Sequence, residues 1–113
     1  MTRVINIKEA PISFQKKDGD QDGFVYIGRP FTFGNPILKY VNCIICGKVH
    51  TTNGSTLVCY EKYLRTRIFS DEDFKLKVKS LLGKTLVCYC KPKKCHGDIL
   101  KKVTEELNFE DIF

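Results

Sequence analysis

The stretch KTLVCYCKPKKCHGDIL, residues 84–100, decides the fold because it joins an apolar run to an amphipathic run through a turn rich in cysteine and lysine. The β-branched and apolar residues at 84–90 predict a buried strand. Residues 95–107 repeat apolar side chains at helical spacing and predict a closing helix. A strand that the chain reaches only through helices favours a parallel neighbour, because parallel strands need a long crossover connection.

Other runs along the chain predict two more strands and two more helices. The β-branched and aromatic runs at 3–7 and 24–29 are bounded by turn residues and predict strands. Residues 57–69 place apolar side chains on one stripe of a helix. The pattern SDED, which begins at Ser70, is that of a capping box and predicts a second helix that ends at Gly83.

The order of these elements (strand, strand, helix, helix, strand, helix) predicts an α/β fold. We expect a small Rossmann-like domain with two or three layers and a partly parallel sheet. At 113 residues the chain is long enough to bury a core without a metal, and it shows no repeat and no linker. A single domain over residues 1–113 is therefore predicted, with a zinc-knuckle-like insertion at about 40–56.

Hydropathy and charge limit the compartment and the partners. No apolar run approaches the roughly 18 residues of a membrane span, and no hydrophobic signal core is present. We therefore expect a cytoplasmic protein with no membrane partner. Six cysteines in a reducing compartment favour metal ligands or buried thiols over disulfides. The net charge of +6 and the pI near 9.0 predict an anionic partner, which could be a nucleotide-like small molecule, a nucleic acid or an acidic protein, and they leave the oligomeric state open.

The segment NCIICGKVH, residues 42–50, has the C-x-x-C-G spacing of a zinc knuckle, in which backbone N–H groups face the sulfur atoms. Zinc is therefore the predicted cofactor, and a metal-free surface hairpin is the alternative. The predicted ligands are Cys43, Cys46 and His50, with Cys59 or the pair at Cys95 and His96 completing a tetrahedral site. We expect metal loss to loosen residues 40–56 more than it unfolds the domain.

A glycine-rich segment, YIGRPFTFGNP at residues 26–36, directly follows a predicted strand. Gly28 and Gly34 would let the backbone approach a ligand closely, and Arg29 can bind phosphate or carboxylate with two parallel hydrogen bonds. Asn35 precedes a proline, which holds it extended and leaves its amide free to bind a ligand. The segment therefore predicts one wall of a ligand site.

The turn after the predicted strand at 84–90 supplies a second wall. Cys90 ends that strand, and Cys95 and His96 begin the next helix, where free N–H groups and lysines attract anions. A helix start also lowers the pKa of a thiol, so Cys95 is a candidate thiolate, and His96 or Asp98 could act as acid or base. In the alternative interpretation this turn only caps the helix or holds a metal.

Taken together, the motifs VYIGRP, FGNP, YEKYL and LLGKTLVCYCKPKKCHGDIL resemble the family called domain of unknown function 4326, small proteins of bacteria and their viruses. The resemblance covers about residues 24–107. It implies signature positions at Arg29, Asn35, Cys90, Cys95, His96 and Asp98, and it makes NCIICGKVH an insertion relative to shorter members. The family is similar to Rossmann-like nucleotide-processing and nucleoside-processing domains.

Three functions fit these patterns. The favoured one is binding or processing of a nucleotide or ADP-ribose-like ligand, because the signature residues gather at strand ends. Its ligand-binding residues would be Gly28, Arg29, Pro30, Gly34, Asn35 and Cys90, and its catalytic residues His96, Asp98 and Cys95. An enzyme of this kind would be a nucleotide or N-glycoside hydrolase or transferase. The alternatives are a zinc-stabilised nucleic-acid-binding module and a viral protein that inhibits a host factor.

Overall fold

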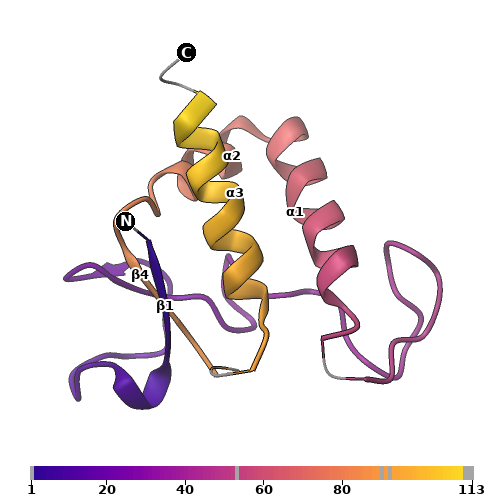
Figure 1. Cartoon of the computed structure of the whole chain (residues 1–113), viewed down its shortest axis with the longest axis horizontal. Coiled ribbons are helices and arrows are strands. Elements are labelled where there is room, and N and C mark those ends of the chain that lie inside the picture. Colours follow the sequence, from indigo (N-terminus) through magenta and orange to yellow (C-terminus); the bar gives the residue numbers. More distant parts are fainter. Residues whose placement is uncertain (1, 53, 90, 92, 111–113) are drawn as a thin grey trace.

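A computed structural model describes residues 2–52, 54–89, 91 and 93–110, and it shows a mixed α/β fold (Figure 1). The four strands are β1 (Arg3–Asn6), β2 (Asp20–Gln21), β3 (Phe24–Tyr26) and β4 (Thr85–Cys88). The helices are α1 (Leu57–Ser70), α2 (Glu72–Lys79) and α3 (His96–Glu110), together with a short 3-10 helix, η1 (Ile7–Glu9). In the parts of the chain so described, no helix is long and apolar enough to cross a membrane.

The strands form one sheet in the order β1-β4-β3-β2. β4 lies in the middle and runs parallel to both β1 and β3, so that Leu86 is paired with Val4 on one side and Val25 on the other. The prediction of a partly parallel sheet is thus confirmed. The sequence did not predict β2, which pairs antiparallel with β3 and has only two residues, both polar.

Two strands are shorter than predicted because the chain turns early. β3 ends at Tyr26, and the chain then makes a tight turn in which the Phe31 N–H donates to the Gly28 carbonyl. β4 ends at Cys88. The turns that follow these two strands, and not the strands themselves, therefore carry most of the predicted site residues.

The helices pack against one another and cover one face of the sheet. Val25 and Leu86 point toward them and join a core with Leu64 of α1 and Leu100 of α3. Tyr26, one residue along β3, faces the other way because side chains alternate along a strand. There its ring lies among those of Phe14, Phe31 and Tyr89. An aromatic cluster from loops thus covers the second face.

A single residue, Asp71, separates the first two helices. Its backbone N–H donates to the Arg67 carbonyl and closes α1, while its side chain accepts from the Phe74 N–H and caps α2. The predicted cap at Ser70 was therefore wrong by one residue. Ser70 is still in α1, where its hydroxyl donates to backbone carbonyls of the preceding turn.

The carboxyl ends of the parallel strands and the starts of α1 and α3 lie at the same end of the molecule, at the bottom of Figure 1. The long loop between β3 and α1 runs past this end. Segments far apart in sequence therefore meet here, and both the cavity and the cysteine cluster described below lie in this region.

Candidate functional site

A cavity of about 600 Å³ opens at this end of the sheet. It is bordered by the ends of the parallel strands, by the starts of α1 and α3, and by the loop before α1. The residues that line it are Asn6, Lys8, Gly28, Arg29, Asn35, Ile37, Lys39, Thr52, Gly54, Thr56, Leu57, Tyr89, Lys91, Lys93, Lys94, Cys95 and His96. The structure thus brings the G-R-P turn (Gly28 and Arg29), Asn35 of the G-N-P turn and the start of α3 to one site.

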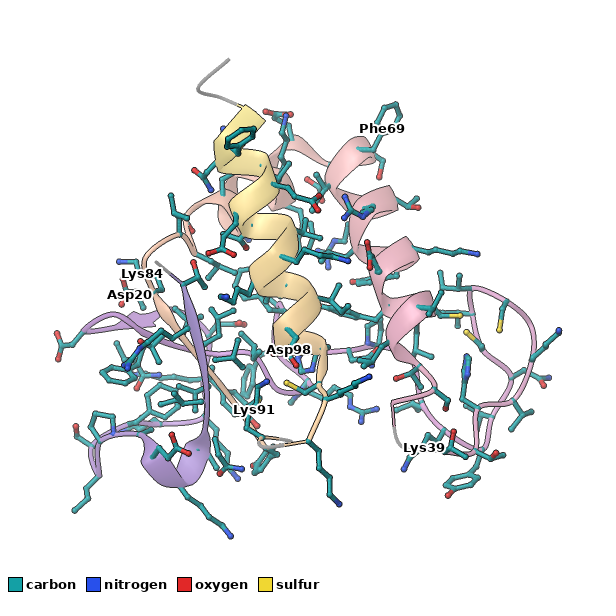
Figure 2. All side chains as sticks on the ribbon, viewed as in Figure 1. Asp20, Lys39, Phe69, Lys84, Lys91 and Asp98 are labelled. Carbon is teal, nitrogen blue, oxygen red and sulfur yellow. The ribbon has the colours of Figure 1, made fainter. Side chains whose placement is uncertain are left out.

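The cavity lining is strongly basic. Six lining residues carry cationic side chains, and none of the described lining residues is an aspartate or glutamate: the cations are Lys8, Arg29, Lys39, Lys91, Lys93 and Lys94. Figure 2 shows Lys91 beside Asp98, at 2.5 Å between Nζ and Oδ1, and this contact raises the pKa of the lysine. Among the described residues, Arg29 forms no ion pair with a carboxylate, so its guanidinium can bind an incoming anion.

Asn6 holds the turn after β4 in place, a role that the sequence did not indicate. Its side-chain Nδ2 donates to the Tyr89 carbonyl at 3.0 Å and to the Lys91 carbonyl at 2.7 Å. Both hydrogens of the amide are therefore used to tie the end of β1 to the lysine-bearing turn. The sequence shows only an asparagine near the end of a predicted strand, and the residues whose carbonyls it binds lie more than 80 positions away.

The two glycines of the G-R-P and G-N-P turns serve different contacts. Gly28 lines the cavity, and a Cβ there would lie 2.2 Å from the Tyr26 hydroxyl oxygen. A Cβ at Gly34 would lie 2.9 Å from the Cα of Arg29, so this glycine packs against the G-R-P turn itself. Gly34 and Pro30 do not line the cavity. The close approach that Gly34 permits in this structure is therefore between two loops.

Asn35 lines the cavity, but its amide is already hydrogen-bonded within the protein. Nδ2 donates to the Thr56 hydroxyl at 3.0 Å, and Oδ1 accepts from the Ile37 N–H at 2.9 Å. The amide is therefore not wholly free as predicted, because its oxygen and one of its two N–H hydrogens are used within the protein. Asn35 instead positions the chain that enters the loop against the start of α1.

His96 is buried at the start of α3 and is held as a neutral imidazole. Its Nε2 lies 2.6 Å from the Ile27 carbonyl oxygen, which can only accept, so Nε2 carries the proton. Burial lowers the pKa of His96, and the nearby Arg29 adds to this effect although the Ile27 carbonyl opposes it. The Nδ1 atom is then left with its lone pair, and the ring edge lies against the face of Tyr60.

Cys95 does not have the properties of a thiolate. Its Sγ lies 3.4 Å from the Sγ of Cys88, and both side chains are buried. The Cys88 thiol and burial raise the pKa of Cys95, and these effects outweigh the helix start. The predicted activation of Cys95 was therefore wrong. Cys90, the third cysteine of this turn, lies outside the described residues.

Asp98 serves the local structure of the turn. Its Oδ2 accepts from the Cys95 N–H at 3.4 Å and its Oδ1 binds Lys91, and it does not line the cavity. The structural interpretation of Asp98, as a helix-capping residue, thus fits the geometry better than an acid–base role.

Gly97 lets α3 begin in direct contact with the sheet. A Cβ on this residue would lie 2.7 Å from Cγ1 of Val4 and 2.9 Å from Cδ1 of Ile27, both closer than real Cβ atoms approach. The pattern around Gly97 did not lead to a prediction for this residue, although a glycine in the first turn of a predicted helix can indicate a close approach to a neighbouring element. Its small size fixes the distance between the start of α3 and the strand ends.

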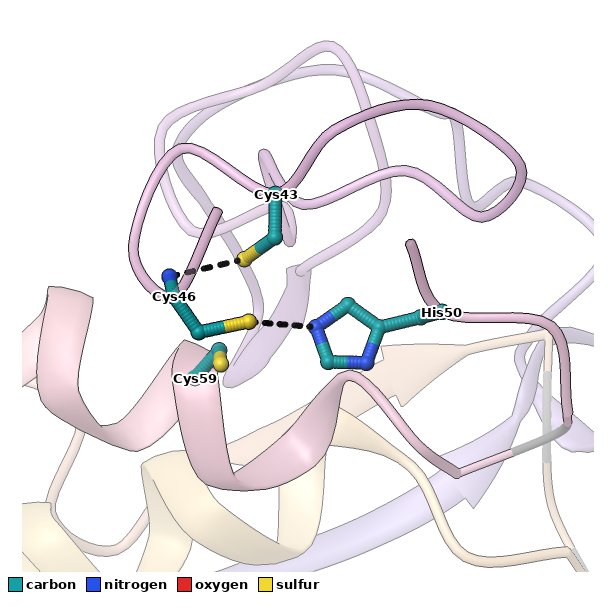
Figure 3. A group of neighbouring side chains, drawn as sticks. All are labelled: Cys43, Cys46, His50 and Cys59. Atoms are coloured by element: carbon teal, nitrogen blue, oxygen red, sulfur yellow. Dashed lines mark hydrogen bonds between the residues drawn. The ribbon is translucent and has the colours of Figure 1, made fainter. Parts of the chain in front are cut away.

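A second group of polar side chains lies beside the cavity, in the loop before α1 and in the first turn of that helix. Cys43, Cys46, His50 and Cys59 offer one ligand atom each, and these four atoms all lie within 4.8 Å of one another (Figure 3). Tetrahedral zinc with Zn–S bonds of about 2.3 Å holds its sulfur ligands roughly 3.8 Å apart, so the arrangement is compatible with zinc. All four protein ligands are present, which is typical of a structural zinc site.

The local backbone explains why the cluster forms. The N–H groups of Ile45 and Cys46 point at the Cys43 sulfur, at 3.3 and 3.5 Å, as expected for a knuckle. Gly47 has φ +77°, a conformation that favours glycine, and closes the turn by donating to the Cys43 carbonyl. Cys46 Sγ then lies 3.6 Å from Nε2 of His50.

The thiols of this cluster differ in acidity. Burial opposes ionisation of Cys43, but the two backbone N–H groups and the side chains of His50 and Cys46 outweigh it and lower its pKa to about 6. Burial, together with the neighbouring Cys46 and Cys43, raises the pKa of Cys59 to about 11. The cluster therefore has one thiol that is more acidic than an ordinary cysteine and one that is less acidic.

Cys59 is the fourth member of the cluster, which settles an alternative that the sequence left open. It comes from the first turn of α1, whereas the other three residues come from the loop. Cys95 instead lies beside the Cys88 thiol, and His96 is hydrogen-bonded to the Ile27 carbonyl. The loop before α1 thus supplies three members of the cluster, and the helical layer supplies the fourth.

Comparison with known proteins agrees with the motif pattern. A family model described as a domain of unknown function (DUF4326) matches residues 12–106. The chain belongs to the DUF4326 family. An uncharacterized 12.4 kDa protein from the nrdA-td intergenic region of Enterobacteria phage T4 is 37% identical over 67 residues, which make up 59% of this chain. This DUF4326 chain covers 61% of that phage protein, and no solved structure shows a significant match.

Proposed function

We propose that the basic cavity binds a small anionic ligand that carries phosphate, and that a nucleotide or an ADP-ribose-like molecule fits it best. The observation that carries this proposal is the set of six cationic side chains around one cavity whose described lining contains no carboxylate. Like charges around a cleft raise the local concentration of an anion and strengthen its binding. The guanidinium of Arg29 adds the planar pair of donors that matches a phosphate group.

The position of the cavity in the sheet supports the same ligand class. Asn6 ends β1, Gly28 follows β3 and Tyr89 follows β4, so the carboxyl ends of three strands with parallel pairing border the cavity. Rossmann-like sheets bind nucleotides in the crevice at this edge. We propose that the DUF4326 sheet is Rossmann-like in this respect, with backbone N–H groups at the start of α3 directed at phosphate.

The size and the remaining lining also suit a nucleotide. A volume of about 600 Å³ lies within the range of roughly 300–1,000 Å³ that is usual for small-molecule sites. Ile37 and Leu57 offer apolar surface to a base, and the Thr52 hydroxyl offers a polar contact to a sugar. His96 is the lining residue suited to accept a proton, through Nδ1, in a hydrolase or transferase acting on such a ligand.

The test is titration of the protein with ADP, ADP-ribose and pyrophosphate by calorimetry. We expect saturable binding of at least one of these probes, and we expect Arg29→Lys to weaken it about tenfold, because lysine keeps the charge but loses the two-pronged geometry. Arg65→Lys is the matched control, since Arg65 lies outside the cavity lining and pairs with Glu61. Absence of binding at millimolar probe, or equal affinity in Arg29→Lys, would overturn the proposal.

The salt dependence of binding separates this function from nucleic-acid binding. A small anion that contacts a few cations gives a shallow dependence of log affinity on log salt, whereas an oligonucleotide that neutralises many phosphates gives a steep one. If a single-stranded oligonucleotide binds with a steep slope while all three small probes fail, the nucleic-acid alternative replaces the proposed function.

We also propose that the cysteine cluster holds one zinc ion. The support is a complete Cys₃His donor set whose atoms lie within 4.8 Å of one another, with backbone N–H groups directed at the first sulfur. Elemental analysis of the purified protein should find close to one zinc per chain, and Cys43→Ser should lose it. Cys95→Ser is the control, because this buried thiol lies outside the cluster. Equal loss of zinc from both variants, or no zinc in the parent, would contradict the assignment.

A further inference from the structure

We infer that zinc at the Cys₃His cluster controls anion binding in the basic cavity, because the ion fixes one wall of that cavity. This wall is the knuckle segment, residues 39–56, which both carries metal ligands and lines the cavity. The inference rests on the proposed function, since it concerns regulation of the same site. Binding of the anion would then depend on zinc, although the zinc ion itself does not contact the anion.

The cavity-lining residues of the knuckle segment lie on both sides of its metal ligands. Lys39 precedes the first ligand, Cys43, by four positions, and Thr52 follows His50 by two. Gly54 also lines the cavity before α1 begins. A change in the position of the metal ligands therefore moves a cation and a hydroxyl that face the cavity.

Among the described contacts of this segment, several join it to itself. The Tyr40 N–H donates to the His50 carbonyl at 2.9 Å, and the Cys43 N–H donates to the Lys48 carbonyl at 2.8 Å. Ile44 and Tyr40 are 69% and 68% exposed. Cys43 is the hairpin residue that packs into the core, and it is itself a member of the cluster. The attachment of the hairpin to the core is therefore centred on the cluster.

Cys59 is the link between this hairpin and the helical layer. It is buried, it belongs to α1, and the other three members of the cluster come from the hairpin. A zinc ion bonded to all four therefore cross-links the hairpin to α1. The hydrogen bond from Asn35 to Thr56 anchors the last residue of the segment. Without zinc, Thr52, two residues after His50, loses the fixed position that an anion in the cavity needs.

The first experiment compares ADP binding to the zinc-loaded and the zinc-free protein, with hydrogen exchange of both forms. We expect removal of zinc to weaken ADP binding by about tenfold, within the usual range of coupling between two sites, and stoichiometric zinc to restore it. Exchange should rise in residues 39–56 and stay slow in β4. Equal ADP affinity in the two forms would overturn the inference. If zinc-loaded protein binds neither ADP, ADP-ribose nor pyrophosphate, the proposed function itself fails instead.

A reciprocal measurement uses only the folded, zinc-loaded protein, in case zinc removal unfolds the chain. Coupling between two binding sites is mutual, so a bound anion must strengthen zinc binding by the same factor. We expect saturating ADP to lower the fraction of zinc that a coloured chelator of known affinity holds at equilibrium with the parent, and to have a much smaller effect in Arg29→Lys at the same ADP concentration. Arg65→Lys should behave as the parent does. An equilibrium distribution of zinc that ADP leaves unchanged in the parent, although calorimetry shows ADP bound, would refute the coupling.

Discussion

Gly97→Ala tests whether the start of α3 is set by contact with the sheet. The new Cβ would lie 2.7 Å from Cγ1 of Val4, 2.9 Å from Cδ1 of Ile27 and 3.2 Å from Sγ of Cys95. The neighbours belong to a strand, to the turn that follows β3 and to the preceding turn, so either these side chains or the helix start must shift to accept the methyl group. The substitution thus disturbs the packing of the helix start that borders the cavity.

Two effects of opposite sign decide the magnitude. Alanine is the better helix former and can stabilise a helix by about 0.5–1 kcal/mol relative to glycine. Overpacking a dense core typically costs about 1–3 kcal/mol. We expect overpacking to dominate, since the shortest of these contacts are well below 3 Å. A net loss of about 1–2 kcal/mol corresponds to a decrease of roughly 4–8 °C in Tm for a chain of this size.

A double-mutant cycle with Val4→Ala makes the explanation specific. Removing the Val4 methyl groups opens the space that the new Cβ needs, so Gly97→Ala should destabilise Val4→Ala protein less than it destabilises the parent. The coupling free energy should be about 0.5–2 kcal/mol, as for residues in contact, and urea unfolding of the four proteins measures it. If Gly97→Ala raises Tm, or if the two substitutions are additive, the close-approach argument fails.

Three further expectations follow from single contacts or pKa values. Asn6→Ala removes two donated hydrogen bonds to the turn after β4, so we expect a loss of about 1–3 kcal/mol in the free energy of unfolding and weaker ADP binding; unchanged values of both would contradict its positioning role. Zinc binding at pH 7.5 should release at least one proton, because Cys59, with a pKa of about 11, is protonated before zinc binds, whereas Cys43, with a pKa of about 6, is mostly ionised. Calorimetry in two buffers of different ionisation enthalpy counts the released protons, and a count of zero would exclude this scheme. Folding lowers the pKa of His96 below its ordinary 6.5, so the unfolded chain binds more protons below that pH and stability is lost as pH falls below about 6.5. His96→Gln should show a smaller loss between pH 6.5 and 5 than the parent in urea unfolding, and parallel curves would rule out the buried neutral imidazole.

The parts of the fold that the sequence predicted are those with a local cause. The apolar run that became β4 and the helical spacing of α1 and α3 are set by neighbouring residues, and their order implied parallel pairing. The C-x-x-C-G pattern is equally local, because the turn itself directs N–H groups at the first sulfur. The two-residue strand β2 has no such pattern and exists only because β3 offers it a partner.

The errors at the candidate site came from side-chain contacts that form only when the chain folds back on itself. Nothing near Asn35 indicates that its amide reaches Thr56, and nothing near Cys95 indicates that Cys88 lies 3.4 Å away. The choice of Cys59 as the fourth cluster residue likewise depends on how the hairpin folds back on α1. Residue types and spacing could therefore propose the site, while the state of each polar group depended on tertiary contacts.

The single residue between α1 and α2 limits how this family can vary in length. Asp71 closes one helix and caps the next, so an inserted residue there would turn α2 by about 100° relative to the core. Phe74 and Val78, both buried, would then rotate toward solvent. The exposed residues Tyr40 and Val41, which precede the C-x-x-C turn, carry neither a core side chain nor a member of the cluster. We therefore expect relatives to gain and lose residues before Cys43 and to keep the helix-to-helix spacing around Asp71 unchanged.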